Sequence, residues 1–257
     1  MKKSTRMFAA AAIAFTSLMA GTALAQEKLV IASEGAYPPF NNLTASGELV
    51  GFDIDIARAL CEEMKVECDI ITNDWDGMIP GLQAKKFDAV IASMSITPER
   101  LEKVDFSEKY YNTGPALAVT KDSPITKVEE LDGKTIGYQV STTHANYAEK
   151  HISGADIKLY PTADEAKLDI SNGRIDAIGD DIVVLSEWLK SDAGACCKLL
   201  TALPMDESIF GKGAGIAVRK GETELAKRFT DAIAAIRANG KYKEVNDKYF
   251  GFDAYGE

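Results

Sequence analysis

The sequence predicts an α/β protein of two lobes, each built on a mainly parallel sheet with flanking helices. Short apolar runs alternate with helical patterns from residue 28 to residue 93, an order that favours a parallel sheet covered by helices. The same alternation restarts after Tyr110-Tyr111, and the segment 211–219 then returns toward the first unit. Two similar units, linked by an outgoing and a returning segment, predict two lobes joined by a two-segment hinge with a cleft between them. The chain of 257 residues is long enough for each lobe to bury its own core.

The first unit is expected to follow a β-α-β-α-β order. Its strands are predicted at 28–33, 67–72 and 87–93, and its helices begin near Gly51 and Trp75. The segment 37–40, Tyr-Pro-Pro-Phe, predicts a rigid turn between the first strand and the first helix. Asp53 and Asp55 lie near the positive end of the first helix dipole, so we interpret them as helix-terminus acids rather than ligand groups.

The second unit repeats this order before the chain returns. Its strands are predicted at 116–120, 135–139, 157–160 and 175–179, its helices at 141–150 and 163–172, and the two closing helices of the chain at 222–238 and 241–249. We therefore place lobe 1 at 26–112 and 212–257, and lobe 2 at 113–211.

Residues 1–25 have the features of a secretory signal. Lys2, Lys3 and Arg6 form a basic start, an apolar centre spans 7–19, and Ala23-Leu24-Ala25 is a small-x-small cleavage site. The alternative of a membrane anchor is disfavoured, because the apolar run is shorter than the roughly 20 residues that span a bilayer. We expect cleavage after Ala25 and an exported, soluble protein.

The charge of the chain is strongly negative. The formal net charge is −10, and removal of the basic leader makes the mature chain more negative still. This argues against nucleic acid and anionic membrane surfaces as partners, and it suits a cationic small ligand. Two histidines and no Cys-x-x-Cys leave no credible metal site, and no cofactor is expected.

The stretch 88–101 combines a strand end with a helix start. An apolar run, 89–92, is followed by Ser93 and Ser95, which point to one face if the chain is extended. Thr97-Pro98-Glu99 then has the features of a helix N-terminus. Arg100, one turn into that helix, can hold a carboxylate through two parallel hydrogen bonds. The alternative is a surface ion pair with Glu99 or Glu102, but open α/β sheets bind ligands at the carboxyl ends of their strands.

Several motifs, spread in order over the mature chain, resemble the family 3 periplasmic solute-binding proteins of ABC importers. They are Gly51 to Met64, the Ser-x-Ser-Ile-Thr-x-x-Arg stretch at 93–100, Lys134-Thr-Ile-Gly, Arg174-Ile-Asp-Ala and Asn239-Gly-Lys-Tyr. The similarity is greatest to the lysine/arginine/ornithine-, histidine- and opine-binding branch. The resemblance implies the two-lobed periplasmic-binding-protein fold, a monomer without catalytic residues, and delivery of a ligand to an ABC-type membrane permease.

The resemblance also implies how an amino acid is bound at its α-carbon. Arg100 would hold the α-carboxylate together with the backbone N–H groups of Ser141, Thr142 and Thr143 at a helix start. Asp181 would accept from the α-ammonium, although its neighbour Asp180 is an alternative.

The side-chain end of the ligand would meet a second group of residues. Tyr37 and Trp75 would enclose its aliphatic or guanidinium part, and Glu34 would face the distal positive charge. Ser93, Met94 and Ser95 complete the implied pocket. Each has a simpler interpretation: Tyr37 and Trp75 as loop packing, Glu34 as a solvated acid, and Ser95 as a turn-stabilising hydroxyl.

Three positions depart from the pattern of the lysine/arginine/ornithine and histidine binders. Glu34 replaces an aspartate and resembles the opine-type members more, Ala92 replaces a serine, and His144 replaces a common glutamine. The four cysteines of an exported chain invite disulfides. Cys61 and Cys68 resemble a disulfide found in some members of the family. For the adjacent Cys196 and Cys197, a strained disulfide, two thiols and intermolecular bridges all remain open.

The sequence thus predicts a receptor that binds arginine, lysine or ornithine, and with lower preference histidine, by lobe closure. One alternative is an opine such as octopine or nopaline. The other is an enzyme resembling cyclohexadienyl dehydratase, for which Glu34 is a conceivable general acid.

Overall fold

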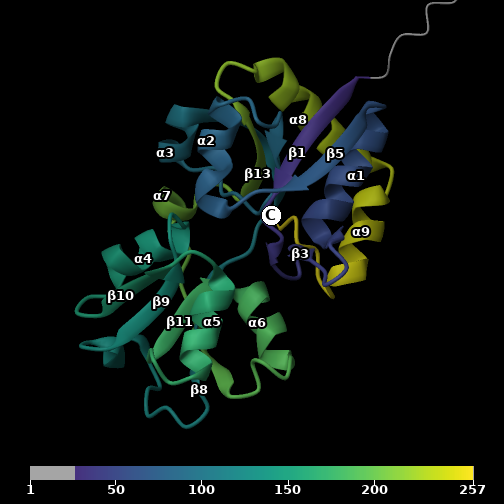
Figure 1. Ribbon diagram of the computed structural model, residues 1–257. Coiled ribbons are helices and arrows are strands. Elements are labelled where there is room, and N and C mark those ends of the chain that lie inside the picture. The colour runs from purple at the N-terminus through teal and green to yellow at the C-terminus, as the bar shows by residue number, and fades with distance from the viewer. Residues whose placement is uncertain (1–26, 257) are drawn as a thin grey trace, which may run out of the picture.

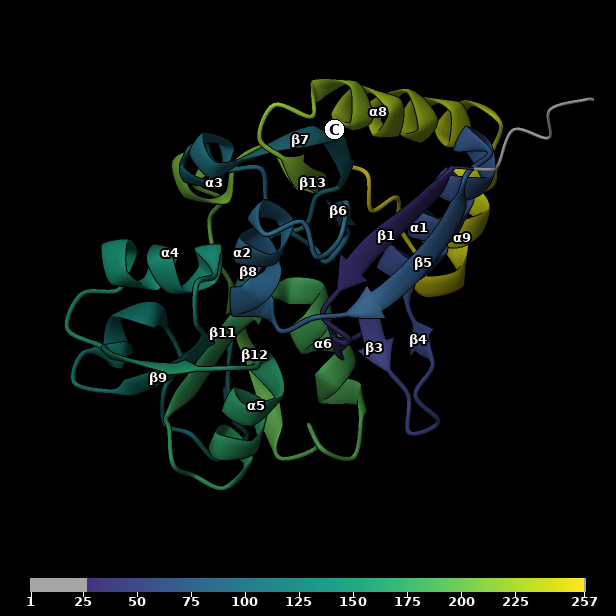
Figure 2. The ribbon, with the colours of Figure 1, turned by 45° about the horizontal axis from the view of Figure 1, so that its top comes forward.

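The computed structural model describes residues 27–256, which form two α/β lobes (Figures 1 and 2). In Figure 1 the teal and green middle part of the chain forms the lower lobe, and the chain on either side of it forms the upper lobe. The α/β class and the two-lobed architecture are therefore confirmed. The signal predicted at 1–25 lies outside the described residues. Within the described part of the chain, no helix is both long and apolar enough to cross a bilayer.

Lobe 1 contains a five-stranded sheet in the order β5-β1-β6-β13-β7. Its strands are β1 (Lys28–Ser33), β5 (Glu67–Thr72), β6 (Ala89–Val90), β7 (Val104–Tyr111) and β13 (Ala214–Arg219). β1 is parallel to β5 and β6, whereas β13 is antiparallel to β6 and β7. A small sheet of β2 (Ala36–Tyr37), β3 (Asn41–Leu43) and β4 (Leu49–Val50) lies beside it.

Lobe 2 contains a second five-stranded sheet in the order β10-β9-β11-β8-β12. Its strands are β8 (Pro115–Thr120), β9 (Thr135–Gln139), β10 (Asp156–Tyr160), β11 (Ala177–Asp181) and β12 (Cys197–Ala202). β9 is parallel to β10 and β11, and β8 is antiparallel to β11 and β12. Each sheet is thus mainly parallel, with its antiparallel strand next to a crossing between the lobes.

The chain crosses between the lobes at 112–114 and again at 203–213. The second crossing includes the short helix α7 (Glu207–Phe210). The lobe boundaries predicted after residues 112 and 211 fall within these crossings and remain predictions.

Helices cover both faces of each sheet, as the strand-helix alternation predicts. In lobe 1 they are α1 (Phe52–Met64), α2 (Met78–Gln83) after a 3-10 turn (Trp75–Gly77), α3 (Pro98–Lys103), α8 (Thr223–Ala238) and α9 (Lys241–Tyr249). In lobe 2 they are α4 (Thr143–His151), α5 (Ala163–Ser171), α6 (Ile182–Lys190) and a 3-10 turn (Val128–Leu131). Successive residues of β8 show why both faces are covered. Ala116 and Ala118 pack toward α5 and α6, whereas Leu117 and Val119 pack toward α4.

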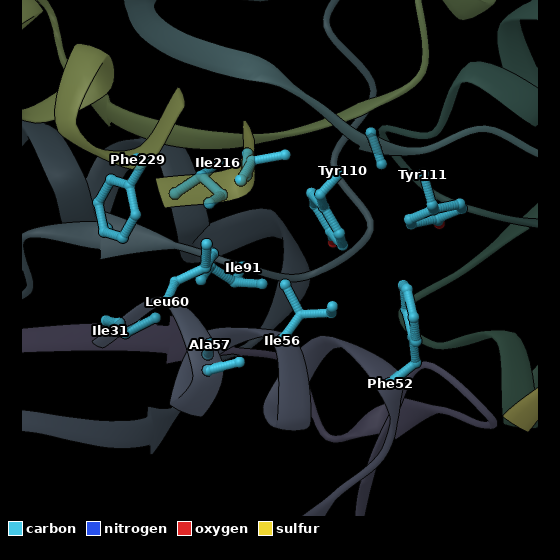
Figure 3. Close-up of a cluster of buried hydrophobic side chains, with 14 of the residues drawn as sticks. Ile31, Phe52, Ile56, Ala57, Leu60, Ile91, Tyr110, Tyr111, Ile216 and Phe229 are labelled. Atoms are coloured by element: carbon cyan, nitrogen blue, oxygen red, sulfur yellow. The ribbon is translucent and has the colours of Figure 1, made fainter. Parts of the chain in front are cut away.

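One hydrophobic cluster of lobe 1 lies between α1, α8 and the sheet (Figure 3), and a second one lies on the side of α2. Phe52, Ile56 and Leu60 share one face of α1 because they are spaced four residues apart, and all three are fully buried. They belong to one cluster with Ile31 of β1 and Phe229 of α8. This packing fixes the carboxyl ends of the lobe 1 strands, where the predicted site lies.

The strand predicted at 87–93 is much shorter in the structure. β6 is restricted to Ala89–Val90, and Ser93 has a left-handed backbone with φ of 56°. The expectation that Ser93 and Ser95 share one face of an extended strand is therefore wrong. At this point Ser93 makes tertiary hydrogen bonds instead of continuing the sheet: its N–H donates to the Tyr110 hydroxyl at 3.0 Å and its hydroxyl donates to Asp53 at 3.0 Å.

Three long elements had not been predicted from the sequence, namely β7, α6 and β12. The pairing of β7 with β13 is interrupted by register shifts around Gly215, which removes the regular alternation that identifies a strand. The helix predicted to begin at Trp75 begins as a single 3-10 turn and continues as α2.

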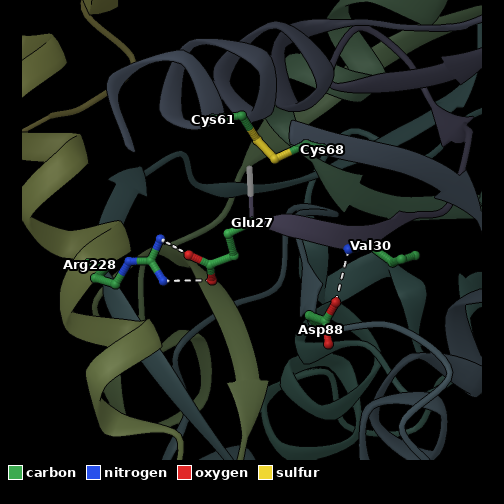
Figure 4. The surroundings of a disulfide bond; sticks show 6 residues. All are labelled: Glu27, Val30, Cys61, Cys68, Asp88 and Arg228. Atoms are coloured by element: carbon green, nitrogen blue, oxygen red, sulfur yellow. Dashed lines mark hydrogen bonds and ion pairs between the residues drawn. A yellow bond between two sulfur atoms is a disulfide. The ribbon is translucent and has the colours of Figure 1, made fainter. Parts of the chain in front are cut away.

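Cys61 and Cys68 form a disulfide, as the resemblance implies (Figure 4). It joins the last turns of α1 to β5, its neighbour in the chain. Figure 4 also shows Arg228 of α8 holding Glu27 through two parallel hydrogen bonds of 2.8 and 2.9 Å. Both contacts lie in lobe 1 and involve no residue of the predicted site.

Candidate functional site

The facing ends of the two lobes contact each other through buried polar side chains. The Tyr37 hydroxyl of lobe 1 donates to Asp180 Oδ1 of lobe 2 at 2.6 Å. The Gln139 amide of lobe 2 donates to Glu34 Oε1 of lobe 1 at 2.6 Å, and also to the Pro161 carbonyl oxygen at 3.1 Å. These groups lie at or next to strand ends, where open α/β sheets bind their ligands.

Arg100 is directed into the interlobe region rather than toward solvent. The Thr97 hydroxyl accepts from the Arg100 backbone N–H at 3.2 Å, which caps α3 and places Arg100 in its first turn. Its guanidinium donates to the carbonyl oxygens of Ser95 and, across the cleft, Ser141, each at 3.1 Å. The alternative of a surface ion pair with Glu99 does not hold, because Glu99 pairs with Lys103 at 2.9 Å. Burial lowers the pKa of Arg100 to about 10, so the group stays cationic at neutral pH.

Trp75 approaches the same carbonyl group as Arg100. Its indole Nε1 donates to the Ser141 oxygen at 3.3 Å, and the Arg100 guanidinium lies over its ring at 5.2 Å from the centroid. The ring is half-buried and forms one wall of the cleft. Aromatic walls of this kind hold the flat or aliphatic part of a cationic chain.

The predicted site residues line three neighbouring spaces between the lobes. A cavity of about 30 Å³ is lined by Glu34, Tyr37, Trp75, Ala92, Ser93, Ser95, Arg100, Gln139, Thr142, Thr143 and His144. A second cavity of about 30 Å³ shares Tyr37, Ser93, Ser95 and His144 with it and adds Asp181. A more open groove of about 740 Å³ is lined by Met94 and Ser141, together with Trp75, Arg100 and Thr143. The structure thus brings together every residue predicted for the site.

Glu34 and Asp181 are acids that the fold holds in an unfavourable environment. Burial raises the pKa of Glu34 to about 7 and the pKa of Asp181 to about 7. Asp181 caps α6 by accepting from the Val183 N–H at 2.7 Å, and it also accepts from the Thr113 hydroxyl. A cation entering the cleft would relieve the cost of ionising these two groups.

Asp180 and Asp181 point in different directions because they are neighbours on β11. Asp180 accepts from Tyr37 and lies 3.8 Å from His144 Nδ1. Asp181 faces the second cavity and the crossing at Thr113. Burial lowers the pKa of His144, so this side chain adds no positive charge beside Asp180 at neutral pH.

Asp53 holds the Ser93 side chain in place by accepting a hydrogen bond from its hydroxyl. Besides Ser93, Asp53 accepts hydrogen bonds from Tyr110 at 2.7 Å and Asn41 at 2.8 Å, and it is fully buried. Burial raises the pKa of Asp53 to about 6. The interpretation of Asp53 as a helix-terminus acid fits its place in the first turn of α1, but it misses this network beneath the pocket.

Gln139 and the Tyr37–Asp180 contact were also missed. Gln139 ends the predicted strand 135–139, so the strand-end rule that selected Arg100 could have identified it. No such signal exists for the Tyr37–Asp180 contact, since its partners lie 143 residues apart in the chain.

Two lobes on paired mainly parallel sheets, with buried polar groups converging between them, define a hinged binding protein for a small polar solute. Residues 29–252 match the bacterial extracellular solute-binding proteins, family 3, and the chain belongs to this family. The curated relatives that follow are named as binding proteins.

Individual relatives cover nearly the whole chain. The L-arginine-binding protein of Pseudomonas aeruginosa is 45% identical over 250 residues, which cover 95% of this chain and 96% of the relative. The histidine-binding periplasmic protein of Salmonella typhimurium is 39% identical over 248 residues, covering 95% of both chains. A periplasmic binding protein of Salmonella typhimurium, whose structure addresses its high arginine specificity, superposes with a TM-score of 0.81 at 32% identity. That match covers 87% of this chain and 99% of the other.

Proposed function

We propose that this protein is a periplasmic receptor for a basic L-amino acid, namely arginine, lysine or ornithine, with histidine as a weaker candidate. The observation that carries the proposal is the charge pattern of the cleft. One buried guanidinium, that of Arg100, lines the cleft together with two acids, the half-buried Glu34 and the buried Asp181. A basic amino acid carries one carboxylate and two cations, which is the complementary set of charges.

The α-carboxylate would bind Arg100 and the N-terminus of α4. Thr142 caps this helix by accepting from the Ala145 N–H at 3.2 Å, which fixes the start of α4 beside the cleft that Thr142 and Thr143 line. Asp181 would accept from the α-ammonium. Ser95 and Ser93 would supply further polar contacts, although the Ser93 hydroxyl already donates to Asp53.

The distal cation would lie against Glu34 while Tyr37 and Trp75 enclose the aliphatic part of the side chain. Gln139 orients the Glu34 carboxylate from the opposite lobe. Because Glu34 and Gln139 belong to different lobes, the distal site is complete only when the lobes close. This makes side-chain recognition and lobe closure one event.

Binding requires the cleft contacts to rearrange. Ligand pockets in proteins usually span roughly 300–1,000 Å³. The cavity lined by Glu34 and the cavity lined by Asp181 each have a volume of only about 30 Å³. An entering carboxylate would replace the Ser141 carbonyl as the partner of Arg100. Lobe opening followed by closure over the ligand provides the necessary space, and an ABC permease would then recognise the closed form.

An opine such as octopine or nopaline is the second candidate, and the 740 Å³ groove favours it. The groove adjoins Arg100 and Trp75, and its lining includes Lys103 and Asn146, which are donors for a second carboxylate. Two acids of the same groove, Asp76 and Glu99, oppose such a group. A free basic amino acid therefore remains the first choice.

Thermal stabilisation of the mature protein by the twenty L-amino acids, octopine and nopaline tests the proposal. A ligand that binds only the folded state adds about 4 kcal/mol at a thousandfold excess over its Kd. Increases in Tm confined to arginine, lysine, ornithine or histidine support the proposal. Larger increases with the opines would favour the second candidate, and increases only with acidic or apolar amino acids would overturn both.

A further inference from the structure

Cys196 and Cys197 form a sulfur pair remote from the residues that line the cleft cavities. Cys197 begins β12, an edge strand of the lobe 2 sheet, and Cys196 is the last residue of the preceding turn. Neighbouring residues of a regular strand point to opposite faces. Because Cys196 lies outside the strand, the turn can bring both sulfur atoms to the same side, where they lie 2.7 Å apart.

This separation lies between a covalent bond and an ordinary contact. A disulfide bond is about 2.05 Å long, and non-bonded heavy atoms have their optimal contact at roughly 3.5–4.0 Å. The two Sγ atoms therefore need to approach by only about 0.65 Å to reach the bond length. The Cys197 N–H also donates to the Gly194 carbonyl oxygen at 3.0 Å, which closes the turn.

The surroundings of the two sulfur atoms differ. Cys197 is only 2% exposed and belongs to the lobe 2 core. Cys196 is half-buried, with its sulfur 3.4 Å from the Ser171 hydroxyl. Burial raises the pKa of the Cys197 thiol to about 12, so Cys196 is the thiol that can react first. An intermolecular bridge from Cys197 would require the core to open.

A metal site is a poorer explanation of the pair. Among residues 27–256, no group of three or more His, Cys, Asp or Glu side chains is arranged to hold a metal ion. The two sulfur atoms would have to be the whole ligand set, whereas structural zinc sites use four ligands.

We propose that Cys196 and Cys197 are a reversible dithiol/disulfide pair. The Cys196 thiolate attacks a disulfide-donating oxidant, RS–SR, forming a mixed disulfide and releasing one RSH. The Cys197 sulfur then loses its proton and attacks the Cys196 sulfur, which displaces the second RSH and closes a ring containing the Cys196–Cys197 disulfide. Two electrons and two protons pass from the protein to the oxidant, which leaves as two thiols.

The ring is expected to be easier to reduce than the Cys61–Cys68 bridge. Disulfides usually join residues whose Cα atoms are 4.4–6.8 Å apart, whereas neighbouring Cα atoms across a trans peptide are only about 3.8 Å apart. The Cα atoms of Cys61 and Cys68 are 6.2 Å apart, within the usual range. Strain of this kind raises the reduction potential and makes a disulfide labile.

Thiol trapping and intact-mass measurement of the exported protein test this proposal. After treatment with oxidised glutathione and denaturing alkylation, we expect no alkyl group and no glutathione adduct on the protein. After mild dithiothreitol treatment, we expect two alkyl groups, both on the peptide that contains Cys196 and Cys197, with the other disulfide intact. Two alkyl groups that persist after oxidation, a stable glutathione adduct, or covalent dimers would overturn the proposal.

Single-cysteine variants test the order of attack. Cys197→Ser should take up one glutathione at Cys196, whereas Cys196→Ser should react at least tenfold more slowly because its remaining thiol is buried. Equal rates would contradict the assignment of Cys196 as the attacking group. Urea unfolding of each variant checks that it is folded, and Cys61→Ala/Cys68→Ala provides a chain in which the vicinal pair is measured alone.

Discussion

Arg100 of lobe 1 donates a hydrogen bond to the backbone carbonyl oxygen of Ser141 in lobe 2 at 3.1 Å. A buried guanidinium thus reaches across the cleft to the residue that precedes the α4 N-terminus. A carboxylate is a stronger partner for Arg than a carbonyl group is, because the bond is charge-assisted on both sides and can be bidentate. The Arg100–Ser141 contact therefore marks the position that a ligand carboxylate is expected to take.

Replacing Arg100 should remove most of the affinity. We expect Arg100→Ala to weaken arginine binding about 100-fold or more, on the order of 3 kcal/mol, because a buried carboxylate loses its charged partner. The arginine affinity of Arg100→Lys should lie between that of Arg100→Ala and that of wild type, because lysine keeps the charge but cannot form the bidentate pair. Calorimetric titration measures both, with Arg58→Ala as the matched control on an exposed arginine of α1. Affinity of Arg100→Ala within threefold of wild type would show that the carboxylate site is elsewhere.

The Tyr37 hydroxyl should increase arginine affinity by stabilising the closed arrangement of the lobes. Tyr37→Phe keeps the aromatic wall but removes the 2.6 Å hydrogen bond to Asp180 in the other lobe. We expect arginine affinity to fall roughly 5- to 30-fold, which corresponds to about 1–2 kcal/mol for one buried hydrogen bond. Tyr249→Phe is the control, because Tyr249 donates to Asp55 within lobe 1 at 2.7 Å. Equal effects of the two variants on affinity would contradict a role in closure.

Arginine affinity should rise with pH between about 5.5 and 8. Burial raises the pKa of Glu34 and of Asp181 to about 7 each, so both carboxyl groups are largely protonated at pH 5.5 and a cation must displace those protons. Since each pH unit below the pKa costs about tenfold per group, we expect binding at pH 8 to be about 30-fold tighter if one group must ionise and about 1,000-fold tighter if both must. Titrations in two buffers of different ionisation enthalpy count the released protons. A flat profile, or Glu34→Gln with an unchanged profile, would refute this.

Without ligand, the carboxyl groups of Glu34 and Asp181 should make the folded protein less stable as the pH rises. Their carboxyl pKa values are higher in the folded protein than the usual values of 4.5 for Glu and 3.8 for Asp. The folded state therefore holds protons that the unfolded chain releases, and their contribution to the free energy of unfolding falls as pH rises from about 4 to about 7. Denaturant unfolding of Glu34→Gln should show less of this decrease than wild type does.

The Cys61–Cys68 disulfide should support stability but not recognition. Closing a loop of about eight residues stabilises the fold by roughly 2.5 kcal/mol on the chain-entropy estimate. Cys61→Ala/Cys68→Ala should lose about that free energy of unfolding in urea. Its arginine affinity should stay within threefold of wild type, because neither cysteine lines a cleft cavity. A large loss of affinity in a folded variant would mean that the bridge shapes the site.

Much of this architecture could be predicted because the strands and helices carry local signals. The apolar run of β1 and the helix start at Thr97-Pro98 can each be recognised from a few consecutive residues, and both are found where expected. β7 escaped prediction because bulges opposite β13 break its alternation. The left-handed backbone of Ser93 was not predicted, because the hydrogen-bond partners of this residue, Tyr110 and Asp53, lie 17 and 40 positions away in the chain.

The polar residues of the site could be predicted from the sequence, but their hydrogen-bond partners could not. Strand ends indicated Arg100 and the Asp180-Asp181 pair, and the resemblance to the family supplied Glu34 and the role of each residue. The pairing of Glu34 with Gln139 joins residues 105 positions apart and arises only when the two lobes face each other. Such contacts between lobes leave no trace in local sequence patterns.

Calorimetric comparison of L-arginine with L-citrulline, its neutral analogue of nearly the same shape, tests the central claim most directly. Both ligands carry the α-carboxylate and α-ammonium, and they differ only at the distal group that Glu34 is proposed to face, where the neutral urea of citrulline replaces the guanidinium. At pH 8 we expect citrulline to bind at least about 100-fold more weakly, because the buried Glu34 carboxylate would be left without a cation. Affinities within threefold of each other would contradict a receptor selective for basic amino acids.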